Sequence, residues 1–290
     1  MPKFKTHGKW ILAGEHSVLR GGHALVFPVR SKFLLFEHIE EDQDFQLNIK
    51  NENRDFEMAF WGVLEKALHR VGHKRSDLKG ELFLNSNIPV GAGMGASATL
   101  CVSLAKWFCS LGWLDEEEQY EFAKGLEDIF HGESSGVDVA VALRNQALEF
   151  QRPHSMESFI PIWQPHLYLS FCGKRGVTAD CVRQVQKLWQ TDEKKARQID
   201  QRMEQAVQMA KQALLEKNNL SLLVEGIQRA NQCFQDWDLI SRDLEVHSKA
   251  LIDKGALVTK PTGSGGGGFV ISLWDKIPNA SDFPFELIET

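Results

Sequence analysis

The segment that most restricts the fold of this chain is "KPTGSGGGGFVISLW", residues 260–274, which joins a run of glycines directly to an apolar stretch. Glycine has no Cβ, so a run of glycines lets the backbone turn sharply and approach a ligand or a neighbouring segment closely. Consecutive backbone N–H groups in such a run can converge on an anion. The apolar stretch that follows predicts a buried strand. The sequence therefore predicts a glycine-lined loop that leads into the core, and a structural hinge is the alternative.

The glycine run contains the spacing GxGxxG at Gly263, Gly265 and Gly268. A dinucleotide-binding fold requires a strand before these glycines, a helix after them and an acidic residue about 20 positions further on. Here the residues after the glycines are typical of a strand, so that context is missing. No glycine group is followed by the GK[ST] of a Walker loop either. The sequence thus disfavours a nucleotide-dependent dehydrogenase.

A second glycine cluster, "NIPVGAGMGASATL" at residues 87–100, follows a predicted strand and opens a predicted helix. The N-terminus of a helix carries a partial positive charge and unpaired N–H groups, and both favour phosphate. This cluster therefore predicts a phosphate-binding loop. Ser97 falls in the first turn of the helix, where its hydroxyl can cap the helix or coordinate a magnesium ion held by the same phosphates.

Charged residues also follow a short apolar run near the start of the chain, in "GKWILAGEHSVLRGG" at residues 8–22. Lys9 begins a predicted strand, and Glu15 and His16 come directly after it. Charges that flank so short a strand, followed by two glycines, indicate a ligand-facing turn rather than a solvated loop.

A fourth segment, "GLEDIFHGESSGVDVAVAL" at residues 125–143, combines acidic residues with a turn. Glu127 and His131 are spaced i and i+4 on a predicted helix and could bind a metal together. Asp138 follows a Ser-Ser-Gly turn and precedes an apolar run. The alternatives are a helix N-cap for Asp138 and a structural role for His131.

The hydrophobic pattern predicts an α+β protein. Strands are expected at 23–29, 32–40, 45–50, 80–87, 166–173 and on both sides of the glycine run, the first three in a mostly antiparallel sheet. Helices are expected at 60–71, 96–112 and 115–132, followed by three helical segments between about 180 and 254. A polar stretch at 150–159 predicts a boundary between two domains, residues 1–155 and 156–290.

The predicted helix at 192–217 carries a row of small apolar residues amid many charges. The row could be a dimer seam, but it spans only about three heptads, which favours a domain helix with one solvated face. Its members are Ala196, Ile199, Met203, Ala206, Ala210 and Ala213.

Composition excludes several classes of protein. The 290 residues suffice for a large core and favour two domains. The net charge of −6 disfavours binding to nucleic acid or to an anionic membrane. No apolar run approaches the roughly 18 residues of a membrane span. The five cysteines are scattered and odd in number, which predicts reduced core thiols and a cytoplasmic protein.

Together the four segments resemble a known family. The patterns "GKxxLxGEHxVxxG", "PxGAGxGASA", "HGxxSGxD" and "KxTGxGGGG" occur in the order seen in the galactokinase, homoserine kinase, mevalonate kinase and phosphomevalonate kinase (GHMP) superfamily, and they are most similar to the mevalonate kinases. The resemblance implies the two-domain α+β GHMP kinase fold. Its N-terminal domain is similar to domain 2 of ribosomal protein S5, its C-terminal domain is a ferredoxin-like α/β sandwich, and its active site lies between them.

The resemblance also implies an activity, which is transfer of phosphate from ATP, with Mg²⁺, to the 5-hydroxyl of mevalonate in isoprenoid biosynthesis. Asp138 would be the catalytic carboxylate, and Lys9 would keep it ionised and stabilise charge. Glu15 and His16 would bind the acceptor. Ser97 and Glu127 would bind the metal. The nucleotide phosphate loop would comprise Pro89, Val90, Gly91, Ala92, Gly93, Met94, Gly95, Ala96 and Ser97.

Two later segments receive roles by the same resemblance. "GKRGVTADCV" places Thr178 near the transferred phosphate, as a further catalytic residue. The glycine run, with Gly263 and Ser264, would close against the phosphate loop and contact substrate. No partner beyond the two substrates is implied, except that a homodimer remains open.

Some positions depart from the family pattern. Ala96 and Ser264 replace the usual serine and alanine, and Ser134 stands where proline is usual. None of these changes removes a proposed catalytic group. Two alternatives therefore remain: another GHMP kinase acting on phosphomevalonate or a sugar, and a ligand sensor that has lost catalysis. His16 argues against the first, because phosphomevalonate kinases more often carry tyrosine there, and the intact Lys9 and Asp138 argue against the second.

Overall fold

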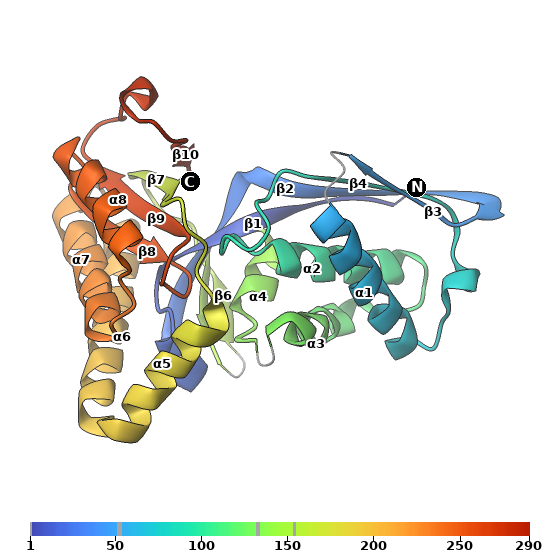
Figure 1. The fold of residues 1–290 in the computed structure, drawn as a ribbon, viewed down its shortest axis with the longest axis horizontal. Coiled ribbons are helices and arrows are strands. Elements are labelled where there is room, and N and C mark those ends of the chain that lie inside the picture. The colour runs from blue at the N-terminus through green and yellow to red at the C-terminus, as the bar shows by residue number, and fades with distance from the viewer. Residues whose placement is uncertain (1, 51–53, 132–133, 153–154) are drawn as a thin grey trace. The chain divides into compact units, whose positions relative to one another are not determined.

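The computed structural model describes residues 2–50, 54–131, 134–152 and 155–290, with the side chains of 54, 55 and 131 left out. Helices and strands occur along the whole described chain, as the α+β pattern predicted (Figure 1). No helix in these ranges combines the length and the apolar character needed to cross a bilayer.

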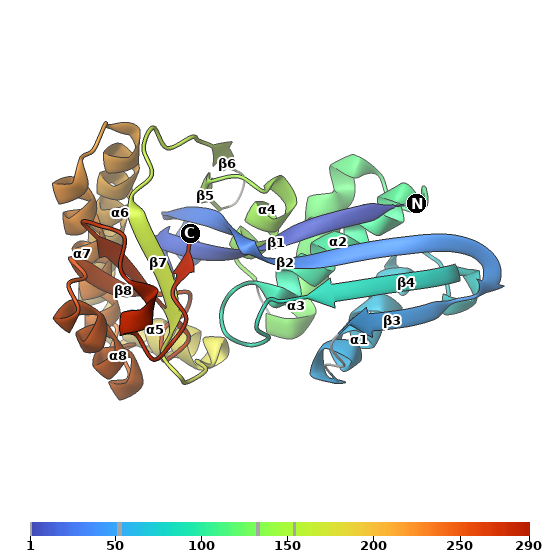
Figure 2. The ribbon, with the colours of Figure 1, turned by 90° about the horizontal axis from the view of Figure 1, so that it is seen from above.

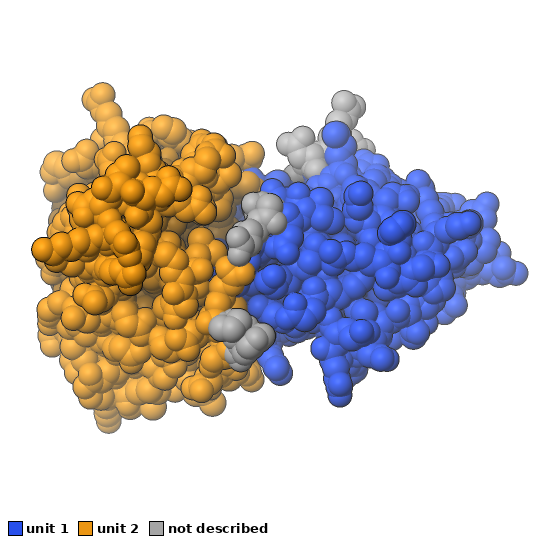
Figure 3. All heavy atoms as spheres, turned by 90° about the horizontal axis from the view of Figure 1, so that it is seen from below, with its two compact units in different colours: residues 1–9, 29–90, 95–145 blue, residues 10–28, 91–94, 146–290 orange. Residues whose placement is uncertain are grey.

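The contacts divide the chain into two compact units (Figure 3). Unit 1 comprises residues 1–9, 29–90 and 95–145, and unit 2 comprises 10–28, 91–94 and 146–290. Neither unit is continuous in sequence, because two long strands, β1 (Lys3–Ala13) and β2 (His23–Asp44), contribute residues to both (Figure 2). The boundary expected near residue 155 stays a prediction.

Strand β2 is one element of 22 residues, whereas the sequence pattern predicted two strands separated near residue 31. The intervening residues are polar and exposed, but they contain no glycine turn signal, so the extended backbone continues through them. In unit 1, β2 pairs antiparallel with β4 (Lys79–Ser86), and β4 pairs parallel with β3 (Gln46–Lys50).

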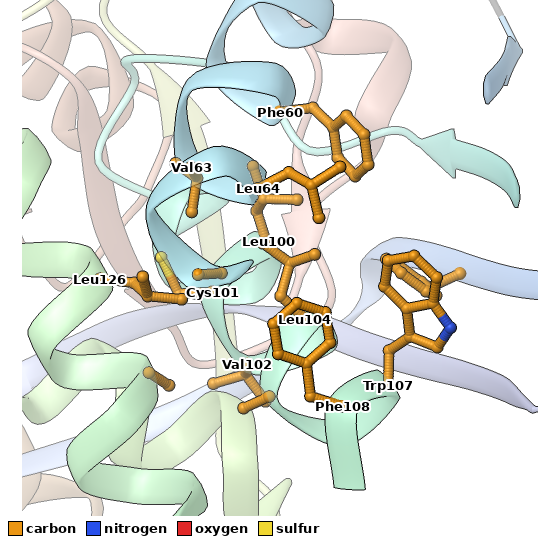
Figure 4. Close-up of a cluster of buried hydrophobic side chains, with 14 of the residues drawn as sticks. Phe60, Val63, Leu64, Leu100, Cys101, Val102, Leu104, Trp107, Phe108 and Leu126 are labelled. Atoms are coloured by element: carbon orange, nitrogen blue, oxygen red, sulfur yellow. The ribbon is translucent and has the colours of Figure 1, made fainter. Parts of the chain in front are cut away.

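Four helices accompany this sheet in unit 1: α1 (Arg54–Arg70), α2 (Ala96–Ser110), α3 (Gln119–His131) and α4 (Val137–Arg144). The apolar face predicted for the first of them is buried at Phe60, Leu64 and Leu68. Helix α2 is apolar on almost all sides, and the buried apolar side chains of the core surround it (Figure 4). Side chains of α1 and α3 pack on it, so α2 is held firmly at the centre of the unit 1 core.

Unit 2 contains a four-stranded antiparallel sheet in the order β10-β7-β9-β8. The strands on either side of the glycine run, β8 and β9, are adjacent in this sheet, and both are fully buried, as predicted. The bounds are β7 His166–Phe171, β8 Val258–Thr262, β9 Phe269–Trp274 and β10 Ile288–Glu289. Two short strands lie beside the first part of β2. Strand β5 (Leu148–Gln151) pairs antiparallel with β2, and β6 (Ser155–Ser158) pairs antiparallel with β5.

Residues 178–253 of unit 2 form four helices where three were expected: α5 (Thr178–Thr191), α6 (Glu193–Leu215), α7 (Leu220–Asp236) and α8 (Arg242–Asp253). The extra break falls at Asp192, whose side chain accepts a hydrogen bond from Lys195 N and so caps a new helix.

The small apolar residues of α6 face into unit 2. All six are buried, and α6 packs along α7 (Figure 1). The row therefore belongs to an ordinary domain helix rather than to a dimer seam. A homodimer formed through another surface stays a prediction.

Candidate active site

Lys9 and Asp138 form an ion pair in unit 1, with 2.9 Å between Lys9 Nζ and Asp138 Oδ1. Only 5% of the lysine side chain is exposed, whereas 26% of the aspartate side chain is. An ammonium group buried to this degree needs a partner, because an unpaired charge in the interior is very costly. The pair therefore joins a buried cation to a carboxylate that a ligand can still reach.

This pair lies beside the start of α2, where the second glycine cluster ends. A Cβ on Gly95, the residue before α2, would lie 3.0 Å from Lys9 Cγ and 3.8 Å from Asp138 Oδ2. Gly95 also adopts a φ of +75°, which disfavours any other residue. The first N–H groups of a helix lack partners within it and favour an anion. An anion bound at this helix end would therefore meet the charge of Lys9 and lie close to Asp138.

Glu127 of α3 is a second carboxylate in unit 1 and is only 2% exposed. Burial, followed by the negative charge of Asp138, raises the pKa of Glu127 to about 8, although the hydrogen bond from Ser134 and the charge of Lys9 act in the opposite direction. Ser134 Oγ lies 2.5 Å from Glu127 Oε2. A buried carboxylate that lies near a second negative charge is in an environment that a cation would stabilise.

The donor atoms expected for a metal are present in unit 1. Ser97 lies half-buried in the first turn of α2, and Glu127 is described above. A hydroxyl and a carboxylate are oxygen donors, which suit Mg²⁺. Within the described ranges, no three His, Cys, Asp or Glu side chains gather as a metal site of their own. That fits Mg²⁺, which usually takes one or two carboxylates and completes its shell with water and substrate phosphates. The side chain of His131 lies outside the described residues.

The two glycine-rich segments meet within unit 2, which contains residues 91–94 of the first and all of the second. A Cβ on Gly93 would lie 3.9 Å from Thr262 O, and a Cβ on Gly268 would lie 3.2 Å from Ala92 O. The first distance is an ordinary contact, whereas the approach at Gly268 leaves little room for a side chain. Pro89 and Val90, which begin the predicted phosphate loop, are half-buried.

The turn after β1 brings His16 to the glycine run. His16 Nε2 lies 2.9 Å from Ser264 O, and since a carbonyl only accepts, Nε2 carries the hydrogen. Burial lowers the pKa of His16 to about 4, so the ring is neutral near pH 7. Its backbone has a φ of +61°, a value rare outside glycine that often marks functional sites.

Glu15, next to His16, takes part in a second ion pair. Lys260 Nζ lies 2.5 Å from Glu15 Oε1, and the two side chains are 0% and 2% exposed. Lys260 Nζ also donates to Ile11 O at 3.4 Å and lies 5.1 Å from the centre of the Phe234 ring. The sequence pattern assigned no role to Lys260, although a lone lysine in a strand of otherwise uncharged residues is itself a signal of a buried partner.

Thr178 and the glycine run also lie together. Ser264 Oγ donates to Thr178 Oγ1 at 3.2 Å, and a Cβ on Gly263 would lie 3.9 Å from Gly93 O. Arg175, which was not among the predicted residues, lies close to the first loop: its Nη1 would be 3.6 Å from a Cβ on Gly91. The structure thus forms two groups. The candidates in unit 1 are Lys9, Pro89, Val90, Gly95, Ala96, Ser97, Glu127 and Asp138. Those in unit 2 are Glu15, His16, Gly91, Ala92, Gly93, Met94, Thr178, Gly263 and Ser264.

Comparisons with known proteins show which sequences and folds this chain resembles. Residues 59–146 match the GHMP kinases N terminal domain. The mevalonate kinase of Thermococcus sibiricus is 26% identical to this chain in an alignment of 296 positions. The alignment covers 91% of this chain and 86% of that protein.

Solved structures share the fold over almost the whole chain. The crystal structure of L. major mevalonate kinase in complex with R-mevalonate superposes with a TM-score of 0.80, with 23% identity, and covers 95% of this chain and 88% of that one. The crystal structure of the Methanococcus jannaschii mevalonate kinase superposes with a TM-score of 0.78 and 18% identity. The match covers 99% of this chain and 96% of that one. The fold is therefore the α+β GHMP kinase fold. Residues 59–146 thus match the N-terminal domain of the GHMP kinases, and the chain is similar to mevalonate kinases over nine-tenths of its length.

Proposed function

We propose that this chain is a mevalonate kinase, which transfers the γ-phosphoryl group of ATP to the 5-hydroxyl of mevalonate and releases ADP. The observation that carries the proposal is the Lys9–Asp138 pair at the start of α2. It combines a reachable carboxylate, a fixed positive charge and a helix N-terminus. The relative from Thermococcus sibiricus supports the choice of acceptor by its name, mevalonate kinase.

The phosphates of ATP bind, in this proposal, to the loop of residues 89–97. The loop offers backbone N–H groups and the N-terminus of α2, both suited to an anion. Arg175 lies against the loop at Gly91 and adds a positive charge. The loop thereby holds the triphosphate in place before the reaction, and positioning supplies much of the rate enhancement in phosphoryl transfer.

Ser97 and Glu127 would hold the Mg²⁺ ion. When bound, the ion neutralises the negative charge of the phosphate oxygens. The raised pKa of Glu127 indicates that the carboxylate lies where a second negative charge is disfavoured and a cation is favoured.

Asp138 and Lys9 act on the acceptor hydroxyl. The hydroxyl donates a hydrogen bond to the Asp138 carboxylate, and its oxygen attacks the γ-phosphorus. The bond from that phosphorus to the β–γ bridging oxygen breaks, ADP leaves, and the proton passes to Asp138. Lys9 stays bonded to Oδ1 of the carboxylate and stabilises the charge that develops. No phosphoenzyme forms on this route.

The acceptor is assigned to the unit 2 group. His16 is neutral and donates to Ser264 O, so its Nδ1 is the ring atom left to accept a hydrogen bond from an acceptor hydroxyl. Thr178, Gly263 and Ser264 contact the transferred phosphate. Glu15 is assigned to the same acceptor site, although its pairing with Lys260 favours a role in fixing the turn. The free cysteines support a cytoplasmic location.

The test is a screen for ADP release with Mg·ATP against mevalonate, phosphomevalonate, homoserine and galactose. The proposal predicts that mevalonate gives the highest kcat/KM. Faster release with another acceptor would replace the assigned substrate, and the absence of release with every acceptor would favour a sensor.

A further inference from the structure

Ser134 lies in the segment between α3 and α4 and contacts the structure on both sides of it. Ser134 Oγ bonds to Glu127 Oε2 at 2.5 Å and to the backbone N of Gly136 at 3.1 Å. The backbone N–H of Ser134 donates to Asp128 Oδ1 at 2.7 Å. One residue thus joins the end of the helix that carries Glu127 to the start of the helix that carries Asp138.

The direction of these bonds follows from the number of hydrogens. Gly136 N–H is a donor, so it occupies a lone pair of Ser134 Oγ. The single hydroxyl hydrogen therefore remains for Glu127 Oε2. With 7% of Ser134 exposed, little water is available to replace this donor.

The far end of the segment is held as well. Gly136 is the residue before α4 and has a φ of +82°, and a Cβ there would collide with Tyr120 Oη of α3. The position that offers its N–H to Ser134 is therefore restricted to glycine. The family usually has proline at position 134, and proline has neither a hydroxyl nor a backbone N–H. The three bonds of Ser134 therefore depend on the serine that this chain carries.

We propose that Ser134 is a positioning residue, which orients the Glu127 carboxylate for the metal ion and couples it to the helix start that presents Asp138. The inference rests on the proposed function, because it needs the metal that ATP binding brings. Partners that hold a metal-binding carboxylate from behind commonly change metal affinity by roughly ten- to a hundredfold when they are removed. Ser134 does not touch either substrate in this proposal.

The experiment compares ADP binding by calorimetry, at zero and at increasing Mg²⁺ concentration, for the wild type, Ser134→Ala and Ser134→Thr. Ser135→Ala is the matched control, because it removes the neighbouring hydroxyl, which accepts a hydrogen bond from Val137 N at 3.3 Å. We expect Ser134→Ala to need roughly ten times more Mg²⁺ for the same gain in ADP affinity, with unchanged affinity in EDTA. Ser134→Thr keeps the hydroxyl and should stay within threefold of the wild type, as should Ser135→Ala.

Two results would overturn the inference. One is a Ser134→Ala variant whose Mg²⁺ dependence equals that of the wild type. The other is an equal loss of ADP affinity with and without Mg²⁺, which would indicate a general structural role. Failure of the proposed function has a different signature, because the wild type itself would then bind ADP with no dependence on Mg²⁺.

Discussion

Two of the lysine–carboxylate pairs among the described residues have opposite character, Lys9–Asp138 in unit 1 and Lys260–Glu15 in unit 2. Both are formed by residues more than a hundred positions apart in sequence. The first leaves 26% of its carboxylate side chain exposed, and the second leaves 2%. A substrate can therefore bond to Asp138, whereas Glu15 is occupied by its lysine and by the surrounding core.

This difference separates a pair with an accessible carboxylate from an enclosed pair. A fully buried ion pair adds little net stability, since desolvation offsets the attraction, but removal of one partner leaves an uncompensated charge. The Lys260–Glu15 pair thus fixes the turn that holds His16 against the glycine run. The Lys9–Asp138 pair fixes a carboxylate without enclosing it.

The largest effect is expected at the exposed carboxylate. Asp138→Asn removes the group that receives the proton and should lower kcat by about a thousandfold, which corresponds to about 4 kcal/mol in activation energy. Nucleotide affinity, measured by calorimetry, should change less than threefold. Asp253→Asn is the matched control, because Asp253 also pairs with a lysine but on the surface. A turnover within tenfold of the wild type would remove Asp138 from the mechanism.

The buried pair should dominate stability instead. Lys260→Met leaves Glu15 charged in the core and should lower the free energy of unfolding by about 3–5 kcal/mol in urea titrations. The double variant Lys260→Met/Glu15→Leu should recover most of this loss. Lys9→Met should cost less, since its partner keeps contact with water. Equal losses for the two lysine variants would erase the contrast between the pairs.

A smaller effect concerns pH. The pKa of His16 is about 4 in the folded state and about 6.5 in the unfolded state, so the unfolded chain binds the proton more tightly. Stability should therefore fall as the pH drops through this window, by about 2 kcal/mol between pH 7 and pH 5. Comparing the wild type with His16→Asn isolates this contribution. The same slope in both proteins would show that His16 is not buried in the neutral form.

The smallest expected effect separates two costs of replacing a glycine. One is the cost of a positive φ, and the other is the cost of a steric contact with another segment. Gly268 and Gly173 have the same φ of +89°, but only Gly268 would bring a Cβ near another segment, at 3.2 Å from Ala92 O. Gly173→Ala should cost about 1 kcal/mol through φ alone. Gly268→Ala should cost about 1 kcal/mol more in thermal unfolding. Equal losses of stability in the two variants would mean that the backbone at residue 92 moves away at no measurable cost in free energy.

Local patterns were sufficient to predict the helices expected at 60–71, 96–112 and 115–132 and the strands on both sides of the glycine run. The partners of individual charges were harder to predict. Lys260 and Glu15 are 245 residues apart, and nothing near either one indicates which residue it meets. The bond from Ser134 to Glu127 depends on a side-chain rotamer in a turn. The break at Asp192 was missed because a single capping residue does not interrupt the helical period.

The central claim is that this chain transfers phosphate directly from ATP to a primary alcohol, and proton-coupled ³¹P NMR of the reaction with mevalonate tests it most directly. The account predicts that the γ-phosphate signal of ATP declines in step with a new phosphate ester signal. That signal should be split into a triplet by the two hydrogens on carbon 5. Release of inorganic phosphate, or an unsplit ester signal from the tertiary hydroxyl, would contradict it.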